Sequence, residues 1–139
     1  MEIKTHGAIS KKLVGVILEI VDGVRAVAEL TSTGEMAADS TGLVHGGFAF
    51  SLADYAAMLA VNQSNVVLGQ AQAKFTAPVR VGETMRAEAI VKKIEGRKTE
   101  VSVEVKVGDK KVLTGSFTCY TLERHVLEND EKNSGKSVG

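Results

Sequence analysis

The sequence predicts a single α+β domain in which a curved antiparallel sheet of about six strands wraps around one long central helix. Three observations predict this fold. An apolar segment without proline, residues 46–61, is too long for a typical buried strand and indicates a helix. Short apolar runs bounded by turn signals lie on both sides of it. One of these runs alternates apolar and polar residues, which indicates a sheet with one buried face.

The predicted fold begins with a hairpin and a loop. Residues 13–20 (LVGVILEI) and 24–30 (VRAVAEL) are apolar runs that flank VDG, and Asp-Gly is a strong hairpin turn signal. We therefore predict a pair of strands. Residues 31–41 are small and polar, which predicts a loop that leads into the helix.

The predicted helix spans residues 46–61, GGFAFSLADYAAMLAV, and the polar run from Asn62 to Asn65 marks its end. Its side chains are apolar on nearly every side, so the helix needs burial on more than one side. Asp54 is its only charged residue. Burying a lone carboxylate is costly unless it is paired, hydrogen-bonded or protonated, which indicates that Asp54 has a function.

Further strands are predicted after the helix. Residues 66–75 (VVLGQAQAKF) predict one strand, and Pro78 in the following turn interrupts pairing. Residues 83–94, 98–107 and 111–122 predict a meander joined by EGR and GDK turns. The middle run alternates valine with serine, glutamate and lysine, so one face of the sheet should be buried. The apolar helix is the segment that this face would cover.

Residues 1–123 are predicted to form this one domain, and the polar residues 124–139 are predicted to be a disordered tail. An open sheet leaves edges that need protection, and pairing with a second copy is a common solution. The sequence therefore predicts a homodimer. It leaves open a dimer of dimers, which would be a homotetramer.

Composition narrows the class of function. The chain has 17 basic and 17 acidic residues, so no net charge would attract nucleic acid or an anionic membrane surface. Cys119 is the single cysteine and lies in an apolar run, which fits a core side chain in a reducing compartment. No apolar signal segment or membrane-spanning run occurs, so we expect a cytoplasmic protein.

No metal site or nucleotide cofactor is expected. His6, His45 and His125 show no metal-ligand spacing among themselves or with Cys119. No glycine-rich phosphate-binding motif occurs. A Ser-His-Asp triad of Ser51, His45 and Asp54 is disfavoured. His45 lies about two helical turns away along the same helix, and a triad needs a different layout.

The remaining chemistry lies on the helix. Gly46 and Gly47 open it, where free N–H groups and the helix dipole could polarise a carbonyl and stabilise an oxyanion. The glycines could instead only allow the chain to turn tightly from the loop into the helix. Asp54 lies about 12 Å farther along the axis, too far to act on the same carbonyl. Two helices lying antiparallel across a dimer axis would bring the N-terminus of one beside Asp54 of the other. Asp54 would then act as general base or nucleophile.

Three other residues are candidates with structural alternatives. His45 could hydrogen-bond to the same carbonyl or shape the loop. Asp39 could position water or substrate, or it could cap a turn. Ser51 lies one helical turn before Asp54 and could pack or line the cleft.

The run from His45 to Asp54, HGGFAFSLAD, resembles the signature of hotdog-fold thioesterases of the phenylacetate-degradation, or PaaI-like, type. The likeness spans nearly the whole chain and ends before the tail. It implies a hotdog fold, a dimer or dimer of dimers, and hydrolysis of acyl-coenzyme A (acyl-CoA) thioesters. Coenzyme A is then part of the substrate, and no separate cofactor is implied.

The resemblance also implies roles for single residues. Asp54 matches the catalytic carboxylate, Gly46 the amide that polarises the thioester carbonyl, and His45 the histidine of the motif. Asp39 stands where relatives often have Asn or Gln. Some relatives carry a hydroxyl residue at the start of the strand after the helix. Here that segment reads VVLGQAQ, and Gln70 or Gln72 would take the place of the hydroxyl residue. The expected substrate-binding residues are Gly47, Ser51, Gln70 and Gln72.

Other hypotheses stay open. Residues 72–83, QAKFTAPVRVGE, also resemble the ligand-binding hotdog domain of a bacterial fatty-acid-synthesis repressor, which favours a non-catalytic acyl-CoA binding or sensing module. A hotdog dehydratase or hydratase is a third hypothesis, which the HGG spacing disfavours. The anionic nucleotide of coenzyme A would need basic residues, and the candidates are Lys92, Lys93, Arg97, Lys98 and Arg80.

Overall fold

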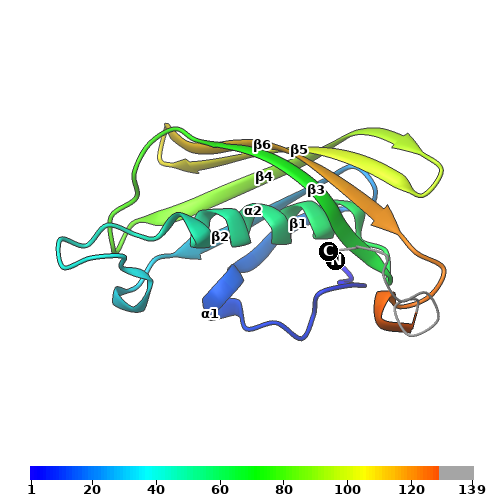
Figure 1. The fold of residues 1–139 in the computed structure, drawn as a ribbon, viewed down its shortest axis with the longest axis horizontal. Coiled ribbons are helices and arrows are strands. Elements are labelled where there is room, and N and C mark those ends of the chain that lie inside the picture. Colours follow the sequence, from blue (N-terminus) through cyan, green and yellow to red (C-terminus); the bar gives the residue numbers. More distant parts are fainter. Residues whose placement is uncertain (129–139) are drawn as a thin grey trace.

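A computed structural model describes residues 1–128 of the chain, and its fold is an antiparallel six-stranded sheet with one long helix against it (Figure 1). The sheet order is β1-β2-β4-β5-β6-β3. The strands are β1 (Val16–Val21), β2 (Arg25–Thr31), β3 (Val66–Phe75), β4 (Thr84–Glu95), β5 (Lys98–Val107) and β6 (Lys110–Thr121). The helices are α1 (Lys11–Val14), the 3-10 turn η1 (Gly34–Met36) and α2 (Gly46–Val61). The predicted hotdog fold is confirmed.

Helix α2 has the bounds that the sequence predicted. It starts after His45, whose backbone is extended with φ −61° and ψ 133°. It ends at Asn62, which adopts the left-handed conformation with φ 50° and donates its N–H to the Met58 carbonyl at 2.8 Å. Asparagine tolerates this conformation better than most residues, so it can end a helix where glycine is absent.

Small side chains let the helix approach the sheet closely. The buried positions of α2 include Ala53, Ala56 and Ala57, and the facing strands contribute Ala28 from β2 and Ala87 from β4. Close packing of such small groups leaves no room for larger side chains. The hairpin between β1 and β2 is tied to the same helix, because the Gly23 N–H donates to the Ala60 carbonyl at 2.9 Å.

The predicted meander is confirmed, with each strand within one residue of its predicted bounds at either end. Val101, Val103 and Val105 of β5 are buried, while the residues between them are partly exposed. The predicted hairpin at VDG is also present, but its first strand begins at Val16 and not at Leu13, because Leu13 and Val14 belong to α1 and Gly15 ends that helix with φ 98°. The loop predicted at residues 31–41 contains η1, which the small polar composition of that segment did not indicate.

Strands β1 and β3 form the two edges of the sheet, and among the described residues β3 pairs only with β6. The predicted tail starts at residue 124; residues 126–128 are helical, and residues 129–139 lie outside the described residues. Within residues 1–128, no helix has both the length and the apolar composition needed to cross a membrane.

Candidate functional site

The HGG motif forms the start of α2, where the His45 side chain caps the helix and glycine at residue 47 leaves room for it. His45 is the N-cap residue, and its Nδ1 accepts a hydrogen bond from the Gly47 N–H at 2.9 Å. A Cβ on residue 47 would lie 2.8 Å from the same Nδ1, so only glycine leaves room for the ring. Because Nδ1 accepts, the proton of the neutral ring belongs on Nε2. His45 therefore caps the helix and keeps its second nitrogen free.

Gly46 offers a backbone N–H group at the first position of α2. The Gly47 N–H donates to the His45 ring and the Phe48 N–H donates to the His45 carbonyl, whereas the Gly46 N–H has no acceptor within residues 1–128. Helix N-termini carry partial positive charge in addition to such free donors. The group is therefore suited to polarise a carbonyl oxygen.

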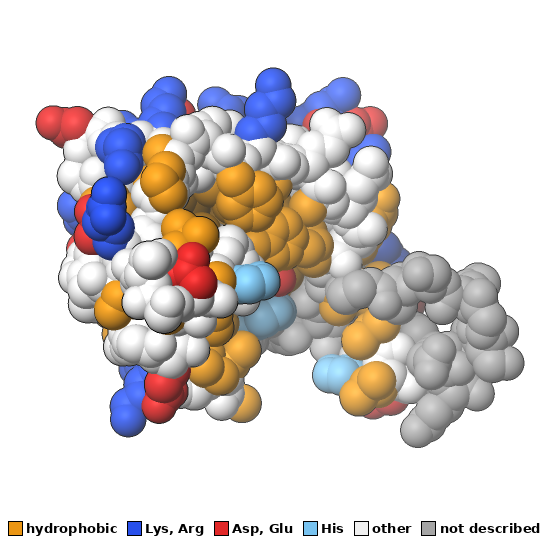
Figure 2. Space-filling view, turned by 60° about the vertical axis from the view of Figure 1, so that its left-hand side comes forward, with side chains coloured by type: hydrophobic (Ala, Val, Ile, Leu, Met, Phe, Trp, Pro, Cys, Tyr) orange, Lys and Arg blue, Asp and Glu red, His pale blue; other side chains and the backbone are white. Residues whose placement is uncertain are grey.

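The surroundings of Gly46 are apolar and open. It lines a cavity of about 430 Å³ together with His45, Leu43 and Phe75. A Cβ on residue 46 would lie 3.2 Å from the Phe75 ring, which is 58% exposed at the end of β3. Figure 2 shows hydrophobic side chains gathered in the middle of one face beside histidine side chains. A contiguous exposed apolar patch of this kind is typical of a binding surface.

Asp54 lies in the middle of α2, and its carboxylate is poorly solvated. Its Oδ1 is buried without a hydrogen-bond partner in the described part of the chain. Burial raises the pKa of the Asp54 carboxyl to about 6. The side chain lines a second cavity, of about 780 Å³, with Met58 and Leu68 among its apolar neighbours. An unpaired carboxylate with a raised pKa in a cavity is a candidate general base or nucleophile.

Gly46 and Asp54 line different cavities of the same chain. They are eight residues apart on one helix, which corresponds to about 12 Å along its axis. One subunit therefore presents the Gly46 N–H and the Asp54 carboxylate in two separate places.

Asp39 holds a turn. Its Oδ1 accepts hydrogen bonds from the Thr41 hydroxyl at 2.7 Å, the Thr41 N–H at 3.0 Å and the Leu43 N–H at 3.3 Å. The Thr41 hydroxyl and the Leu43 N–H lower the pKa of the Asp39 carboxyl. The carboxylate lies on the loop that leads to Gly46 and lines neither of the two cavities described above. The structure shows the turn role that the sequence offered as one alternative.

The structure does not bring Gln70 or Gln72 to Asp54. Ala71 and Ala73 of β3 pack against the core, and side chains alternate along a strand, so the two glutamines face away from the helix. Gln72 lines an outer groove with Ser102 and Ser116. Sequence reasoning placed these glutamines in the site by their position after the helix, without the β-bulge between Leu68 and Gln70.

Two other side chains near Asp54, Ser51 and Cys119, are weak candidates for a role in a reaction. Ser51 is half-buried one turn before Asp54 on α2, and it lines neither cavity. Cys119 is fully buried in the core, as predicted. Burial and the negative charge of Asp54 raise the pKa of the Cys119 thiol to about 12, so it is not a nucleophile at neutral pH. Among residues 1–128 no cluster of side chains is suited to bind a metal ion.

Most of the basic candidates for the nucleotide of coenzyme A are committed to ion pairs on β4 and β5 or in the turn between them. Lys93 pairs with Glu95 at 3.0 Å, and Arg97 pairs with Glu123. Arg80 lies elsewhere, in a β-bridge with Leu43 beside the Gly46 cavity. Of the predicted basic residues, Arg80 is therefore the one placed near the start of α2.

Sequence reasoning missed the N-terminal residues of the Asp54 cavity. Residues 3–7 line it, and so does His125 from the end of the described chain. The only sequence signal was a pair of histidines outside the motif, which were considered as metal ligands and set aside. Their position on the wall of the Asp54 cavity depends on the tertiary fold, which local patterns do not encode.

Comparison with known proteins gives a match between residues 41–114 and the model of the thioesterase superfamily. Among solved structures, an uncharacterized protein from Pyrococcus horikoshii is 50% identical, with a TM-score of 0.89, and the match covers 91% of this chain and 97% of that chain. The PaaI protein of the Escherichia coli phenylacetic acid degradation operon is 26% identical, with a TM-score of 0.75 and coverage of 83% and 84%. These matches agree with the PaaI-like resemblance.

Two curated relatives are similar over most of this chain. A methylthioribose-1-phosphate isomerase from Aquifex aeolicus is 46% identical over 117 residues, which are 84% of this chain and 25% of the relative. The transcription factor FapR from Thermoanaerobacter pseudethanolicus is 31% identical over 117 residues, which are 84% of this chain and 58% of the relative. The chain therefore spans a quarter of the first relative and less than two-thirds of the second.

Proposed function

Because this chain belongs to the thioesterase superfamily, whose model matches residues 41–114, we propose that it is an acyl-CoA thioesterase with a reaction site shared between two subunits. The observation that carries the proposal is the pair of unused groups on α2. The Asp54 carboxylate lies in a cavity without a hydrogen-bond partner for Oδ1, and the Gly46 N–H lacks an acceptor, both among the described residues. Thioester hydrolysis needs one group of each kind.

The geometry of the sheet supports a shared site. Strand β3 is a free edge of ten residues in the described chain, long enough to pair with a second copy. Antiparallel pairing of two β3 edges would place the two α2 helices antiparallel. The start of one helix would then lie beside the middle of the other, which joins Gly46 of one subunit to Asp54 of its partner.

In the proposed reaction, the Gly46 N–H of one subunit donates a hydrogen bond to the thioester carbonyl oxygen. Asp54 of the other subunit accepts a proton from water, and the water oxygen forms a bond to the carbonyl carbon. The resulting oxyanion is stabilised by the same N–H. Collapse of this intermediate breaks the C–S bond, and the proton held by Asp54 passes to the leaving thiolate, which gives free acid and coenzyme A.

Asp54 could instead attack the carbonyl carbon directly. This route forms a mixed anhydride and expels the thiolate, and water then hydrolyses the anhydride to regenerate the carboxylate. Hydrolysis in ¹⁸O-labelled water under single-turnover conditions separates the two routes. The anhydride route leaves label in Asp54 when water attacks the Asp54 carbonyl, whereas the general-base route never labels the enzyme.

The proposal is tested by replacing Asp54. A panel of short, branched, aromatic and long acyl-CoAs is assayed for thiol release by wild type, Asp54→Asn and Asp54→Ala. Loss of the base or nucleophile should reduce kcat by about a hundredfold or more, while the oligomeric state is kept. Asp109→Asn, an exposed aspartate in the β5–β6 turn, is the matched control. Unchanged turnover in the Asp54 variants would remove this residue from the mechanism.

A second candidate function is a non-catalytic acyl-CoA binding or sensing module. It is favoured by the 31% identity to FapR, a transcription factor. Isothermal titration with the same acyl-CoA panel distinguishes the two functions. Tight binding by the wild type together with no thiol release supports the binding module and excludes the thioesterase.

A further inference from the structure

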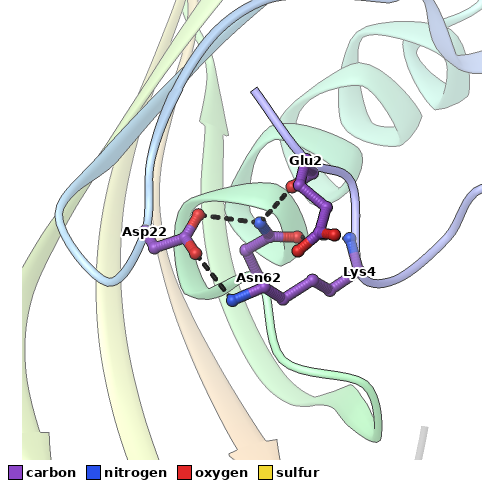
Figure 3. Close-up of polar contacts among 4 residues, drawn as sticks. All are labelled: Glu2, Lys4, Asp22 and Asn62. Carbon is purple, nitrogen blue, oxygen red and sulfur yellow. Dashed lines mark hydrogen bonds and ion pairs between the residues drawn. The ribbon is translucent and has the colours of Figure 1, made fainter.

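The first residues of the chain are fixed in place by a buried amide. We call residues 2–7 the N-terminal strap. Asn62, at the end of α2, accepts a hydrogen bond from the Lys4 N–H at 2.9 Å and donates to the Glu2 carbonyl and to Asp22 Oδ1, each at 2.8 Å (Figure 3). Lys4 Nζ also pairs with Asp22 Oδ2 at 2.9 Å. The strap is therefore tied both to the helix and to the β1–β2 turn.

The burial of Asn62 makes this arrangement more than a surface contact. Its side chain is 0% exposed, and all three of its hydrogen bonds go to the strap or to Asp22. A buried amide without partners would cost free energy, so the folded state favours the ordered strap. Chain termini are otherwise the segments that fray most readily.

The strap forms one wall of the cavity that contains Asp54. Residues 3–7 line this cavity, and Thr5 is only 9% exposed. The Thr5 Oγ1 lies 2.7 Å from His6 Nδ1, so the two side chains share a hydrogen bond. This bond occupies Nδ1 and leaves Nε2 as the ring nitrogen available to the cavity.

His6 adopts a backbone conformation that few residues with a Cβ adopt. Its φ is 54°, in the left-handed region. Such strained positions are concentrated at functional sites. Desolvation also lowers the pKa of the His6 imidazole below its usual value, which favours the neutral ring.

Given the thioesterase activity proposed above, on which this step rests, we propose that His6 is a further residue of the reaction site that orients the attacking water for Asp54. In this arrangement Nδ1–H donates to Thr5 Oγ1, and Nε2 accepts one hydrogen of the water. The other hydrogen of the same water is directed at Asp54. No covalent bond to His6 forms.

Besides His6 and Asp54, two titratable side chains line this cavity, Lys4 and His125, and both are less suited to the role. Lys4 is committed to Asp22. His125 Nδ1 accepts a hydrogen bond from the Leu127 N–H at 3.1 Å, which caps the helical residues 126–128. Of these three residues, only His6 lines the cavity and is also hydrogen-bonded to a buried side chain, that of Thr5.

The left-handed backbone of residue 6 allows a sharp test. Glycine and asparagine both tolerate this conformation, so His6→Gly removes the ring without adding strain, and His6→Asn restores a hydrogen-bond acceptor. A purely structural role predicts that the two variants behave alike. The proposal predicts that kcat falls at least about tenfold in His6→Gly with KM little changed, and that His6→Asn recovers part of the loss. Asp109→Asn, the exposed aspartate of the β5–β6 turn, is the control and should keep wild-type kcat.

Two results would overturn the proposal while the wild type still hydrolyses acyl-CoA: equal kcat in His6→Gly and wild type, or equal losses in the glycine and asparagine variants. If the wild type hydrolyses no acyl-CoA, the proposed function fails and NMR decides this inference. Nitrogen shifts of the His6 ring should then report the Nδ1–H tautomer, and they should change when hexyl-CoA, a thioether that cannot be hydrolysed, is added. An Nε2–H tautomer, or no change on addition, would contradict it.

Discussion

At the scale of single residues, Asp54 combines a cavity position with an unusual ionisation. Burial raises the pKa of its carboxyl to about 6, and in the described residues Oδ1 has no partner to stabilise the charge. A carboxylate whose pKa lies closer to neutrality is a stronger base than an ordinary aspartate, and it is still ionised at pH 7. The same burial that costs folding free energy therefore serves the chemistry.

This pKa predicts an acid limb in the activity. Asp54 must be ionised to act, so the rate should fall about tenfold per pH unit below pH 6 and reach a plateau above it. An acyl-pantetheine substrate avoids the titrating phosphates of coenzyme A, and circular dichroism at each pH controls for unfolding. A rate that stays flat down to pH 4 would show that Asp54 ionises like an exposed aspartate.

The sequence pointed to single candidate residues where a local pattern set them apart. The lone charge in an apolar helix pointed to Asp54, and the glycines after His45 pointed to a helix start with free N–H groups. The cap formed by the His45 ring needed the structure, because histidine is not a usual N-cap residue. His6 was missed because it and Asp54 line one cavity from distant parts of the chain.

At the scale of elements, α2 and the meander were predictable because each has a strong period or composition of its own. The apolar run of residues 46–61 and the alternating valines of β5 define these elements without tertiary information. The facing of Gln70 and Gln72 was not predictable in the same way. The β-bulge between Leu68 and Gln70 shifts the alternation of side chains along β3. Gln70 and Gln72 therefore face the opposite side of the sheet from the one expected by counting from Leu68.

The hydrogen bonds of Asn62 hold the N-terminal strap against the end of α2. Asn62→Gly keeps the left-handed backbone but removes three hydrogen bonds, and it should lower the free energy of unfolding by about 2–3 kcal/mol. Asn62→Ala should lose about 1 kcal/mol more, because alanine is strained at φ 50°. Urea unfolding followed by circular dichroism measures both values. Asn62→Gly with wild-type stability would show that the amide does not hold the strap.

At the scale of the whole molecule, the edge strand β3 and the apolar surface at its end have no partner in the described chain. Strand β3 pairs on one side only, and the exposed Phe75 ring lies beside Gly46 at its end. The shared-site proposal accounts for both features together, because a second copy would cover the edge and supply the missing half of the site. From the edge alone the sequence predicts a homodimer, and this stays a prediction.

Removing one N–H group without disturbing the helix is feasible at Gly46. Proline is well tolerated at the first position of a helix, and His45 before it already has the extended backbone that proline requires. The ring of the exposed Phe75 would need to shift by a few tenths of an ångström to make room for a Cβ. Gly46→Pro therefore removes the proposed polarising donor and keeps the fold.

The central claim, that two subunits share each reaction site, is tested most directly by mixing two inactive variants. Gly46→Pro and Asp54→Ala each disable every site of their own homodimers. After subunit exchange in an equal mixture, half of the dimers are hybrids with one complete site, so about a quarter of wild-type activity should return. Native mass spectrometry confirms that the hybrids have formed. A mixture that contains hybrids and yet stays as inactive as its parents would contradict the account.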